Sequence, residues 1–299
     1  MRLKRGGFVC LTSTICASLV SQITCANAVQ RRQHVAIAQQ ELPDLSGKTD
    51  KVIMFVGPCS IESEEQFAQA AECFHDMGLS WIRGGTFKPR TNPHSFQGLG
   101  LPGVKIMHDV CAHYHLKSLT EVLDTEMCET VAKQVDGLQI GARNFQNFSL
   151  LRRMGKVAAE HNSLVMFKRG FAGTIDEWLA ATSYITNEGA KNVMLCERGL
   201  RTFETATRFT LDISAVPVLH KLSTFPVCVD VSHAAGQRDL VPSLAKAALA
   251  AGADAIMIEV HPNPHVALSD SAQQLTLEQF KRLFDELSGI AHALGKTLV

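Results

Sequence analysis

The sequence FPVCVDVSHAAGQRDLVPSLAKAALAAGADAIMIEVH, residues 225–261, contains two short apolar runs separated by a segment with helical spacing. The runs are residues 225–233 and 253–261, and the segment between them, residues 240–252, closes on a glycine suited to a helix C-cap. Strands buried on both faces read as continuous apolar runs, and their alternation with helices implies parallel pairing. The stretch therefore predicts a strand, a helix and a second strand of one parallel sheet.

The same unit recurs along most of the chain. Further helix candidates lie at residues 63–78 and 174–189. Eight apolar runs can be counted, at residues 51–57, 79–85, 116–122, 136–142, 163–170, 192–199, 225–233 and 253–261. Eight such units in one domain predict an α/β fold of the (β/α)₈ or TIM barrel type over residues 49–299. An open doubly wound sheet is the alternative, disfavoured because nothing resembling GxGxxG follows the first run.

Residues 1–48 differ in composition from the rest of the chain. They have a basic start, an apolar stretch interrupted by Ser and Thr, the triplet Ala26-Asn27-Ala28, and no acidic residue before Glu41. This pattern predicts a targeting-like or disordered segment: a signal peptide, a transit sequence or both in tandem, with a wrongly assigned start codon as the alternative. We expect the protein in the cytoplasm or, if the segment is a targeting sequence, in an organelle such as a plastid. The apolar stretch is shorter than the ~20 residues that a membrane span needs, so no membrane association is expected of the mature protein.

The overall charge and the cysteines exclude several classes of protein. The 29 Lys and Arg residues balance the 29 Asp and Glu residues, which argues against nucleic-acid binding. The nine cysteines show no paired CxxC spacing, and several lie in apolar runs. They are expected to be reduced core residues and not a disulfide framework.

Polar side chains follow every predicted strand. In (β/α)₈ barrels the chemistry takes place at the carboxyl ends of the strands. The groups at these ends are Cys59, Arg83 with Lys88 and Arg90, Glu121, Arg143, Lys168, Glu197 with Arg198, His233, and Glu259 with His261. We therefore expect one shared site at the barrel mouth.

Cations form the first group of candidate site residues. They are Arg83, Lys88, Arg90, Arg143, Lys168 and Arg198, with Arg201 as a further candidate. Gathered at one mouth they would repel one another unless anions were bound between them. Arginine binds carboxylate and phosphate oxygens bidentately, so the expected ligand carries several anionic groups. Gly84, Gly85 and Gly141 would let backbone N–H groups approach an oxyanion.

A second group is Cys59, His233, Glu259 and Asp270. A thiol, an imidazole and two carboxylates suit Mn²⁺, Fe²⁺, Co²⁺ or Zn²⁺ better than Mg²⁺ or Ca²⁺. A cysteine of the core and a histidine acting as a base are the alternatives for Cys59 and His233. Asp230 and His261 are candidates to orient the ligands.

The motifs that carry these residues resemble one known family. In chain order they are GPCSIES (57–63), RGGTFKPRTNPHSFQGLG (83–100), QIGARNFQNF (139–148), FKRG (167–170), CERGLRTFE (196–204), DVSHAAGQRDLV (230–241), MIEVHPNP (257–264) and ALSDSAQQL (267–275). The series is similar to that of the 3-deoxy-D-arabino-heptulosonate 7-phosphate (DAHP) synthases, in the shorter subtype related to 3-deoxy-D-manno-octulosonate 8-phosphate (KDO8P) synthases.

The resemblance implies a metal-dependent transferase at the first step of the shikimate pathway, which leads to chorismate and the aromatic amino acids. The substrates would be phosphoenolpyruvate and D-erythrose 4-phosphate, and the products DAHP and phosphate. The implied cofactor is a divalent metal ion, Mn²⁺ first, with Fe²⁺, Co²⁺ or Zn²⁺ as alternatives. A homo-oligomer, dimer or tetramer, is also implied.

The resemblance assigns roles to matching positions. The metal ligands would be Cys59, His233, Glu259 and Asp270. Phosphoenolpyruvate would be held by Arg83, Lys88, Arg143, Lys168 and Arg198, with Gly141 and Ala142 also in the substrate-binding set. Arg90 and Thr91 would bind the phosphate of the sugar. Lys88 is the candidate general acid, and either Glu121 or His233 would handle water protons.

One departure and two alternatives remain. The family has DPSH where this chain has DVSH, so Val231 replaces a proline before the histidine. A KDO8P synthase, which uses arabinose 5-phosphate, is the nearest alternative, and KPRT at residues 88–91 argues against it. The other alternative is a barrel that binds phosphometabolites without turnover.

Overall fold

The computed structural model describes residues 49–299, so the targeting segment predicted at residues 1–48 lies outside the described residues. The predicted fold is confirmed. Eight parallel strands close into a barrel: β1 (Lys51–Gly57), β2 (Trp81–Arg83), β3 (Lys117–Glu121), β4 (Gly137–Ile140), β5 (Leu164–Lys168), β6 (Val193–Glu197), β7 (Val227–Asp230) and β8 (Ala255–Glu259). Each strand pairs with the next, and β1 pairs with both β8 and β2, which closes the ring.

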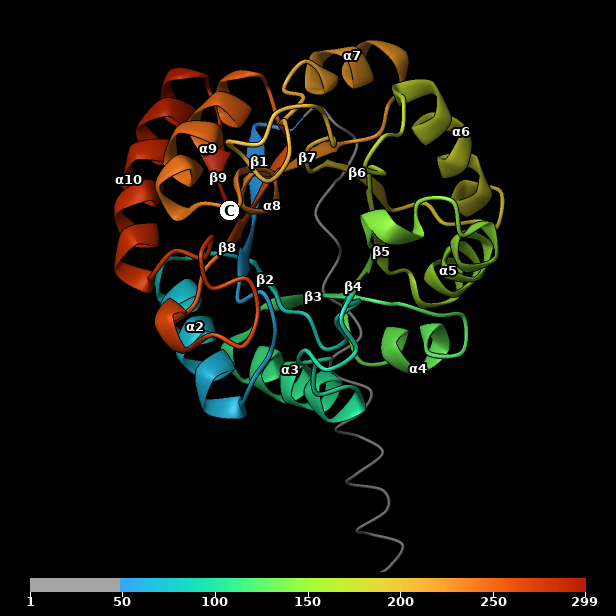
Figure 1. The fold of residues 1–299 in the computed structure, drawn as a ribbon, viewed down its shortest axis with the longest axis horizontal. Helices are drawn as coiled ribbons and strands as arrows, with labels where there is room; N and C mark the ends of the chain where they lie inside the picture. The colour runs from blue at the N-terminus through green and yellow to red at the C-terminus, as the bar shows by residue number, and fades with distance from the viewer. Residues whose placement is uncertain (1–48) are drawn as a thin grey trace, which may run out of the picture. The chain divides into compact units, whose positions relative to one another are not determined.

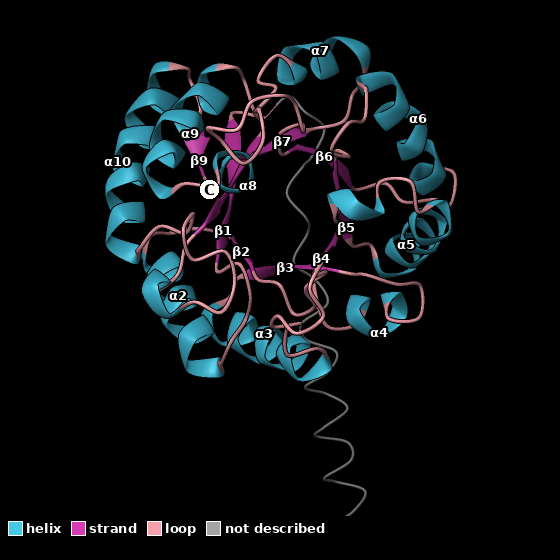
Figure 2. Cartoon of the chain, viewed as in Figure 1, coloured by secondary structure: helices cyan, strands magenta, loops and turns pink. Residues whose placement is uncertain are grey.

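Helices surround the strands, as Figures 1 and 2 show. They are α2 (Glu64–Asp76), α3 (Leu101–Tyr114), α4 (Cys128–Ala132), α5 (Phe148–His161), α6 (Ile175–Thr186), α7 (Ala215–Leu222), α8 (Val231–Ala235), α9 (Val241–Ala250) and α10 (Leu277–Ala293). Three short 3₁₀ turns, η1 (Ala142–Asn144), η2 (Arg238–Leu240) and η3 (Pro264–Val266), lie in the loops. No helix among residues 49–299 is long and apolar enough to cross a membrane.

The helices begin at capping residues. Ser63 accepts a hydrogen bond from the backbone of Gln66 at the start of α2. Thr174 before α6 and Thr276 before α10 each form a reciprocal capping box with the residue three positions later. Such caps satisfy backbone N–H groups that a helix leaves unpaired at its start. The structure confirms the helices predicted at residues 63–78, 174–189 and 240–252, which are α2, α6 and α9.

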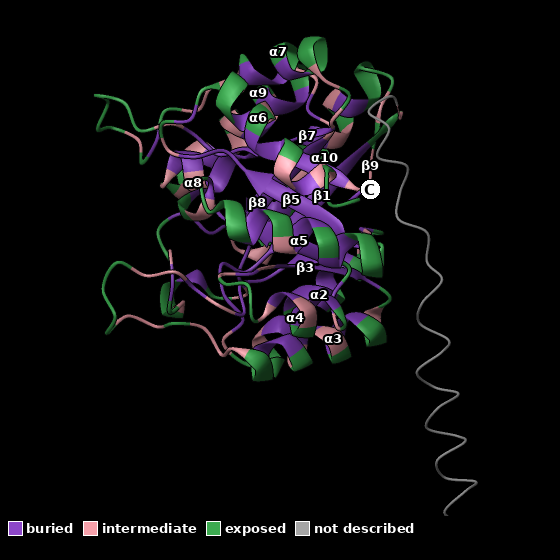
Figure 3. Ribbon diagram, turned by 90° about the vertical axis from the view of Figure 1, so that its right-hand side faces the viewer, coloured by how far each residue is buried: buried purple, intermediate pink, exposed green. Residues whose placement is uncertain are grey.

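The strands are buried as expected for a closed parallel barrel. Every residue of β5, β6 and β8 is buried, because one face of each strand points into the barrel and the other packs against helices. Figure 3 shows the buried strands inside helices whose outer faces are exposed. The six cysteines within the described part of the chain are all free and buried, as predicted.

Two details differ from the sequence prediction. The run at 225–233 is not one strand, because β7 ends at Asp230 and the short helix α8 begins at Val231. The Asp230 side chain accepts a hydrogen bond from the backbone N–H of His233 and so caps that helix.

A ninth strand, β9 (Thr297–Leu298), also pairs with the start of β1. In Figure 3, α8 and the chain's C-terminal end lie at opposite ends of the barrel.

Candidate active site

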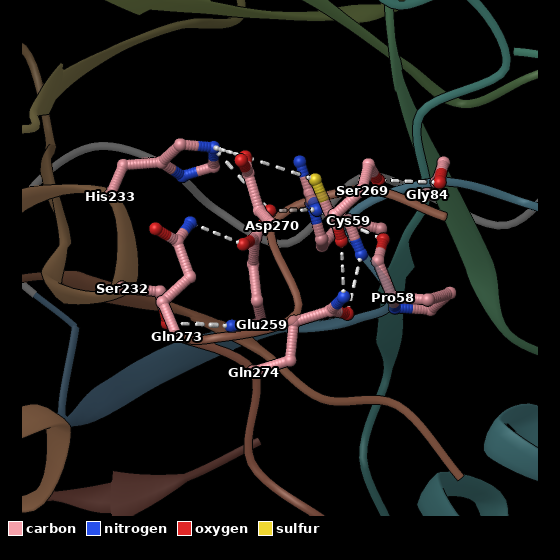
Figure 4. Close-up of polar contacts among 12 residues, drawn as sticks. Pro58, Cys59, Gly84, Ser232, His233, Glu259, Ser269, Asp270, Gln273 and Gln274 are labelled. Carbon is pink, nitrogen blue, oxygen red and sulfur yellow. Dashed lines mark hydrogen bonds and ion pairs between the residues drawn. The ribbon is translucent and has the colours of Figure 1, made fainter. Parts of the chain in front are cut away.

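The predicted metal ligands come together at the carboxyl end of the barrel. One ligand atom from each of Cys59, His233, Glu259 and Asp270 lies within 4.8 Å of the others. The Cys59 Sγ to Asp270 Oδ2 distance is 3.3 Å, and His233 Nε2 lies 3.4 Å from Glu259 Oε1 and 3.9 Å from Asp270 Oδ2. Figure 4 shows the four side chains pointing toward one another. We call these four residues the ligand cluster.

The local fold explains how His233 reaches the cluster. It is the third residue of α8, the helix that starts directly after β7. Val231, where the family has proline, is buried at the first position of that helix, and the Asp230 cap holds the start in place without it. The second Asp230 oxygen lies 2.7 Å from His233 Nδ1, at ion-pair distance. Asp230 therefore faces one ring nitrogen while the other faces the cluster.

The electrostatics of the ligand cluster suit a divalent metal ion. Burial lowers the pKa of His233, which favours a neutral imidazole with a free electron pair. The pKa of Asp270 is lowered although burial opposes its ionisation, because the positive charges of a protonated His233, of Arg208 and of Lys88 favour the carboxylate. Burial, with the charge of Glu259, raises the pKa of the Cys59 thiol to about 12, so the thiol keeps its proton until a metal ion displaces it. One sulfur, one nitrogen and two carboxylates are a donor set for a transition-metal ion.

Three of the predicted cations border the ligand cluster. Nζ of Lys88 lies 3.0 Å from Cys59 Sγ and 3.1 Å from the Cys59 carbonyl oxygen. Arg83 Nη1 lies 2.9 Å from Glu259 Oε1, and Lys168 Nζ donates to Asp230 Oδ2 at 2.5 Å. All three cations are buried, and each is compensated by a group of the cluster or its surroundings.

Three arginines form a second group, which we call the arginine group. The guanidinium carbons of Arg143, Arg198 and Arg201 lie 5.9, 5.0 and 5.2 Å from the centre of the Phe171 ring. Within residues 49–299, no carboxylate lies at ion-pair distance from any of them. Burial lowers the pKa of Arg198 to about 10, because its charge is largely removed from water. A buried arginine without an anionic partner indicates a place for an anionic ligand.

Glu121 and Gly141 are in direct contact. A Cβ atom on Gly141 would lie 1.9 Å from Glu121 Oε1, so only glycine fits against this carboxylate. Gln139 donates to the other Glu121 oxygen at 3.3 Å. Ala142, the next residue, is buried and begins η1. Glu121 is therefore fixed at the end of β3, facing the end of β4.

The other predicted residues are placed differently. Arg90 is half-buried and Thr91 exposed in the loop after β2, and in the described part of the chain neither forms a hydrogen bond or ion pair with the ligand cluster. Glu197 pairs with Arg169 at 2.9 Å and accepts from the Gly199 N–H at 2.6 Å, which is a structural role. His261 lies 3.5 Å from Glu62.

Among the residues that contact the cluster, sequence reasoning missed Gln273, Gln274 and Arg208, and also Ser232, whose Oγ accepts from the Glu259 N–H at 2.9 Å. Gln273 donates to Glu259 Oε2 at 2.6 Å, and Gln274 accepts from the Cys59 N–H at 2.9 Å. Their only signal was the pair of amides in the motif that carries Asp270. Arg208, which lies 3.4 Å from Asp270 Oδ2, comes from the loop between β6 and α7 and had no signal of its own.

Comparison with known proteins agrees with this geometry. The family model described as the DAHP synthetase I family matches residues 33–293. The chain belongs to the DAHP synthetase I family. This confirms the resemblance that the motifs indicated.

Two relatives show how this DAHP synthetase I member relates to others. The phospho-2-dehydro-3-deoxyheptonate aldolase of Thermotoga maritima is 45% identical over 267 residues, 89% of this chain and 78% of the relative. The 2-dehydro-3-deoxyphosphooctonate aldolase of Caulobacter vibrioides is 29% identical over 259 residues, 81% of this chain and 88% of the relative. The similarity to the heptonate enzyme is thus clearly higher.

Solved structures agree as well. The crystal structure of the Thermotoga maritima DAHP synthase has a TM-score of 0.82 at 45% identity, covering 87% of this chain and 75% of that one. A truncated form of the Thermotoga maritima enzyme has a TM-score of 0.79 at 42% identity, covering 87% of this chain and 94% of that one. The barrel of this DAHP synthetase I member is therefore similar over nearly its whole described length.

Proposed function

We propose that this protein condenses phosphoenolpyruvate with D-erythrose 4-phosphate, with water, to give DAHP and inorganic phosphate. The observation that carries the proposal is the 45% identity to the Thermotoga maritima heptonate aldolase, against 29% to the Caulobacter octonate aldolase. The site geometry supports it, because a ligand cluster and an arginine group lie at the carboxyl ends of the strands of one barrel. This is the first reaction of the shikimate pathway.

The ligand cluster is the proposed metal centre. Cys59, His233, Glu259 and Asp270 would hold a divalent transition-metal ion, Mn²⁺ first, with Fe²⁺, Co²⁺ or Zn²⁺ as alternatives. When bound there, the ion would supply Lewis acidity toward the aldehyde oxygen of erythrose 4-phosphate.

The cations have two proposed tasks. Arg143 and Arg198, which have no carboxylate partners in the described chain, would bind the anionic groups of phosphoenolpyruvate. Arg83 and Lys168 would help to orient it, although part of their charge is already offset by Glu259 and Asp230. Fixing both substrates in reactive geometry is a large part of the catalysis expected here.

The proton transfers follow from the bonds that change. C3 of phosphoenolpyruvate forms a bond to the aldehyde carbon, and the aldehyde oxygen takes up a proton, for which Lys88 is the proposed donor. Positive charge develops at C2, where water adds, and the resulting hemiketal phosphate expels inorganic phosphate. Both ring nitrogens of His233 already face carboxylates, so Glu121 is the better candidate to accept the proton from water.

The choice of sugar phosphate can be tested directly. Phosphate release is measured with erythrose 4-phosphate and with arabinose 5-phosphate offered separately to the full-length protein. We expect kcat/KM to favour erythrose 4-phosphate by at least about 100-fold, equal to roughly 2.7 kcal/mol in transition-state binding. Preference for arabinose 5-phosphate would favour a KDO8P synthase, and release with neither aldose at any metal would favour a binding protein.

Arg90 is proposed to bind the phosphate of the sugar, together with Thr91. Because charge-assisted hydrogen bonds are among the stronger ones, Arg90→Ala should raise the KM for erythrose 4-phosphate more than about tenfold. The KM for phosphoenolpyruvate should stay within about twofold of the parent value. Steady-state kinetics with each substrate varied in turn measures both constants, and an equal rise in the two would contradict the division of roles.

A further inference from the structure

One loop contacts the ligand cluster at three points. Residues 269–274 contain the candidate ligand Asp270, and the two glutamines that follow reach two further ligands. Gln273 donates to the Glu259 carboxylate at 2.6 Å, and Gln274 accepts from the Cys59 backbone N–H at 2.9 Å. The loop thus connects with the carboxyl ends of β8 and β1.

The side-chain amide of Gln274 forms a hydrogen bond through its oxygen and another through its nitrogen. Its Oε1 accepts from the Cys59 N–H at 2.9 Å, while its Nε2 donates to the Ser269 carbonyl oxygen at 2.8 Å. The side chain has an exposed fraction of 0%, so neither bond can be replaced by one to bulk water. A single amide therefore links the backbone at Cys59 with the residue before Asp270, as Figure 4 shows.

A hydroxyl pair makes a second link between the same segments. The Oγ atoms of Ser60 and Ser269, each next in sequence to a candidate ligand, lie 2.6 Å apart and both are buried. Cys59 and Asp270 are 211 residues apart in sequence, and their ligand atoms lie 3.3 Å apart. The two links hold these distant segments together beside the cluster.

The backbone at Asp270 needs such support. Its φ is +46°, in the left-handed region that residues other than glycine seldom adopt. A strained conformation persists only where its surroundings hold it in place. Gln274 fixes the residue before Asp270, and Gln273 N–H donates to the Asp270 carbonyl oxygen at 3.2 Å.

We infer that Gln274 is a positioning residue that sets metal affinity by holding Cys59 and Asp270 at ligand spacing, with the Ser60 and Ser269 hydroxyls as a second link. The inference rests on the metal centre proposed above. Gln274 itself bonds to two backbone groups and to none of the four ligand atoms. Its effect is therefore on geometry and not on the charge of the ligands.

The test uses Co²⁺ as probe, titrated into the metal-free full-length protein. Binding is followed by the thiolate-to-cobalt charge-transfer band, which reports specifically on Cys59 coordination. Outer partners of metal ligands change affinity by roughly 10- to 100-fold, so Gln274→Met should raise the Co²⁺ Kd by about that factor and weaken the band at saturation. Ser269→Ala, a smaller change, should raise the Kd about three- to tenfold.

A matched control separates positioning from general loss of stability. Ser118→Ala also removes two hydrogen bonds of a buried hydroxyl, the Oγ bond to Asp136 Oδ2 at 2.9 Å and the bond accepted from Asp136 N–H at 3.1 Å, at the other end of the barrel. It should lower the Tm yet leave the Co²⁺ Kd within about twofold of the parent, because the ligand spacing is untouched.

The outcomes can be told apart. A Kd within about twofold of the parent for Gln274→Met and Ser269→Ala would overturn the inference. If Gln274→Met does not fold, the Kd of Ser269→Ala decides alone. Absence of Co²⁺ binding to the parent itself would instead overturn the proposed metal centre.

Discussion

Replacing Lys88 by alanine is expected to lower kcat by about 10²- to 10⁴-fold, the usual contribution of a positioned proton donor. The Lys88 ammonium is buried and lies 3.0 Å from Cys59 Sγ, beside the place where the aldehyde oxygen would be held. Burial opposes its charge, but the negative charges of an ionised Cys59 and of Glu259 outweigh this and raise the pKa of Lys88. The side chain therefore stays protonated and can donate at neutral pH.

Stopped-flow and steady-state phosphate release measure this effect. Lys88→Met, which keeps the apolar stem, should show the same loss and excludes a packing defect as the cause. The control is Lys105→Ala, on the exposed face of α3, where Lys105 pairs with Asp109. A kcat within about threefold of the parent for Lys88→Met, under roughly 0.7 kcal/mol, would remove Lys88 from the chemistry.

Arg198→Leu should lower kcat/KM for phosphoenolpyruvate by about 30- to 1000-fold. Loss of charge-assisted hydrogen bonds to a bound anion costs about 2–4 kcal/mol, and each 1.4 kcal/mol is a factor of ten. Arg198 is buried, stacks on Phe209 at 3.8 Å, and within the described residues has no carboxylate at ion-pair distance. The charge of Arg198 therefore contributes little to the stability of the ligand-free protein.

The same variant makes a prediction about stability. Because a buried cation without an anionic partner is costly, Arg198→Leu should have a Tm no more than a few degrees below that of the parent. Arg282→Leu, on the exposed surface of α10, is the control and should leave both activity and Tm unchanged. Unaltered kcat/KM together with a large fall in Tm would show that Arg198 is structural.

Much of the fold could be predicted because burial determines the residue pattern. Residues 255–258 within the run at 253–261 are all apolar, since β8 is buried on both faces, and such a pattern predicts a buried strand. The end of β7 could not be predicted from the sequence. Val231 continues the apolar run, but the Asp230 side chain caps a helix there, a local bond that apolar periodicity does not report. Strand β9 was missed because two residues, Thr297 and Leu298, carry no pattern.

The residues of the candidate site also fall into those that the sequence could predict and those that it could not. Cys59, His233, Glu259 and Asp270 could be proposed because thiol, imidazole and carboxylate groups have a chemistry of their own. Gln274 and Arg208 could not, because a glutamine or arginine in a loop has the same appearance whether it faces solvent or a ligand. Their importance comes from packing between segments far apart in sequence.

Metal dependence is the most direct test of the central claim that the ligand cluster is the metal centre of a DAHP synthase. Full-length protein is stripped with chelator, and phosphate release is measured with phosphoenolpyruvate and erythrose 4-phosphate as Mn²⁺ is added back. We expect no release in chelator, restoration by Mn²⁺, and no restoration of Cys59→Ala at the same Mn²⁺ concentrations. Phosphate release at the full parent rate in the presence of chelator, or restoration of Cys59→Ala by Mn²⁺ to the parent rate, would contradict it.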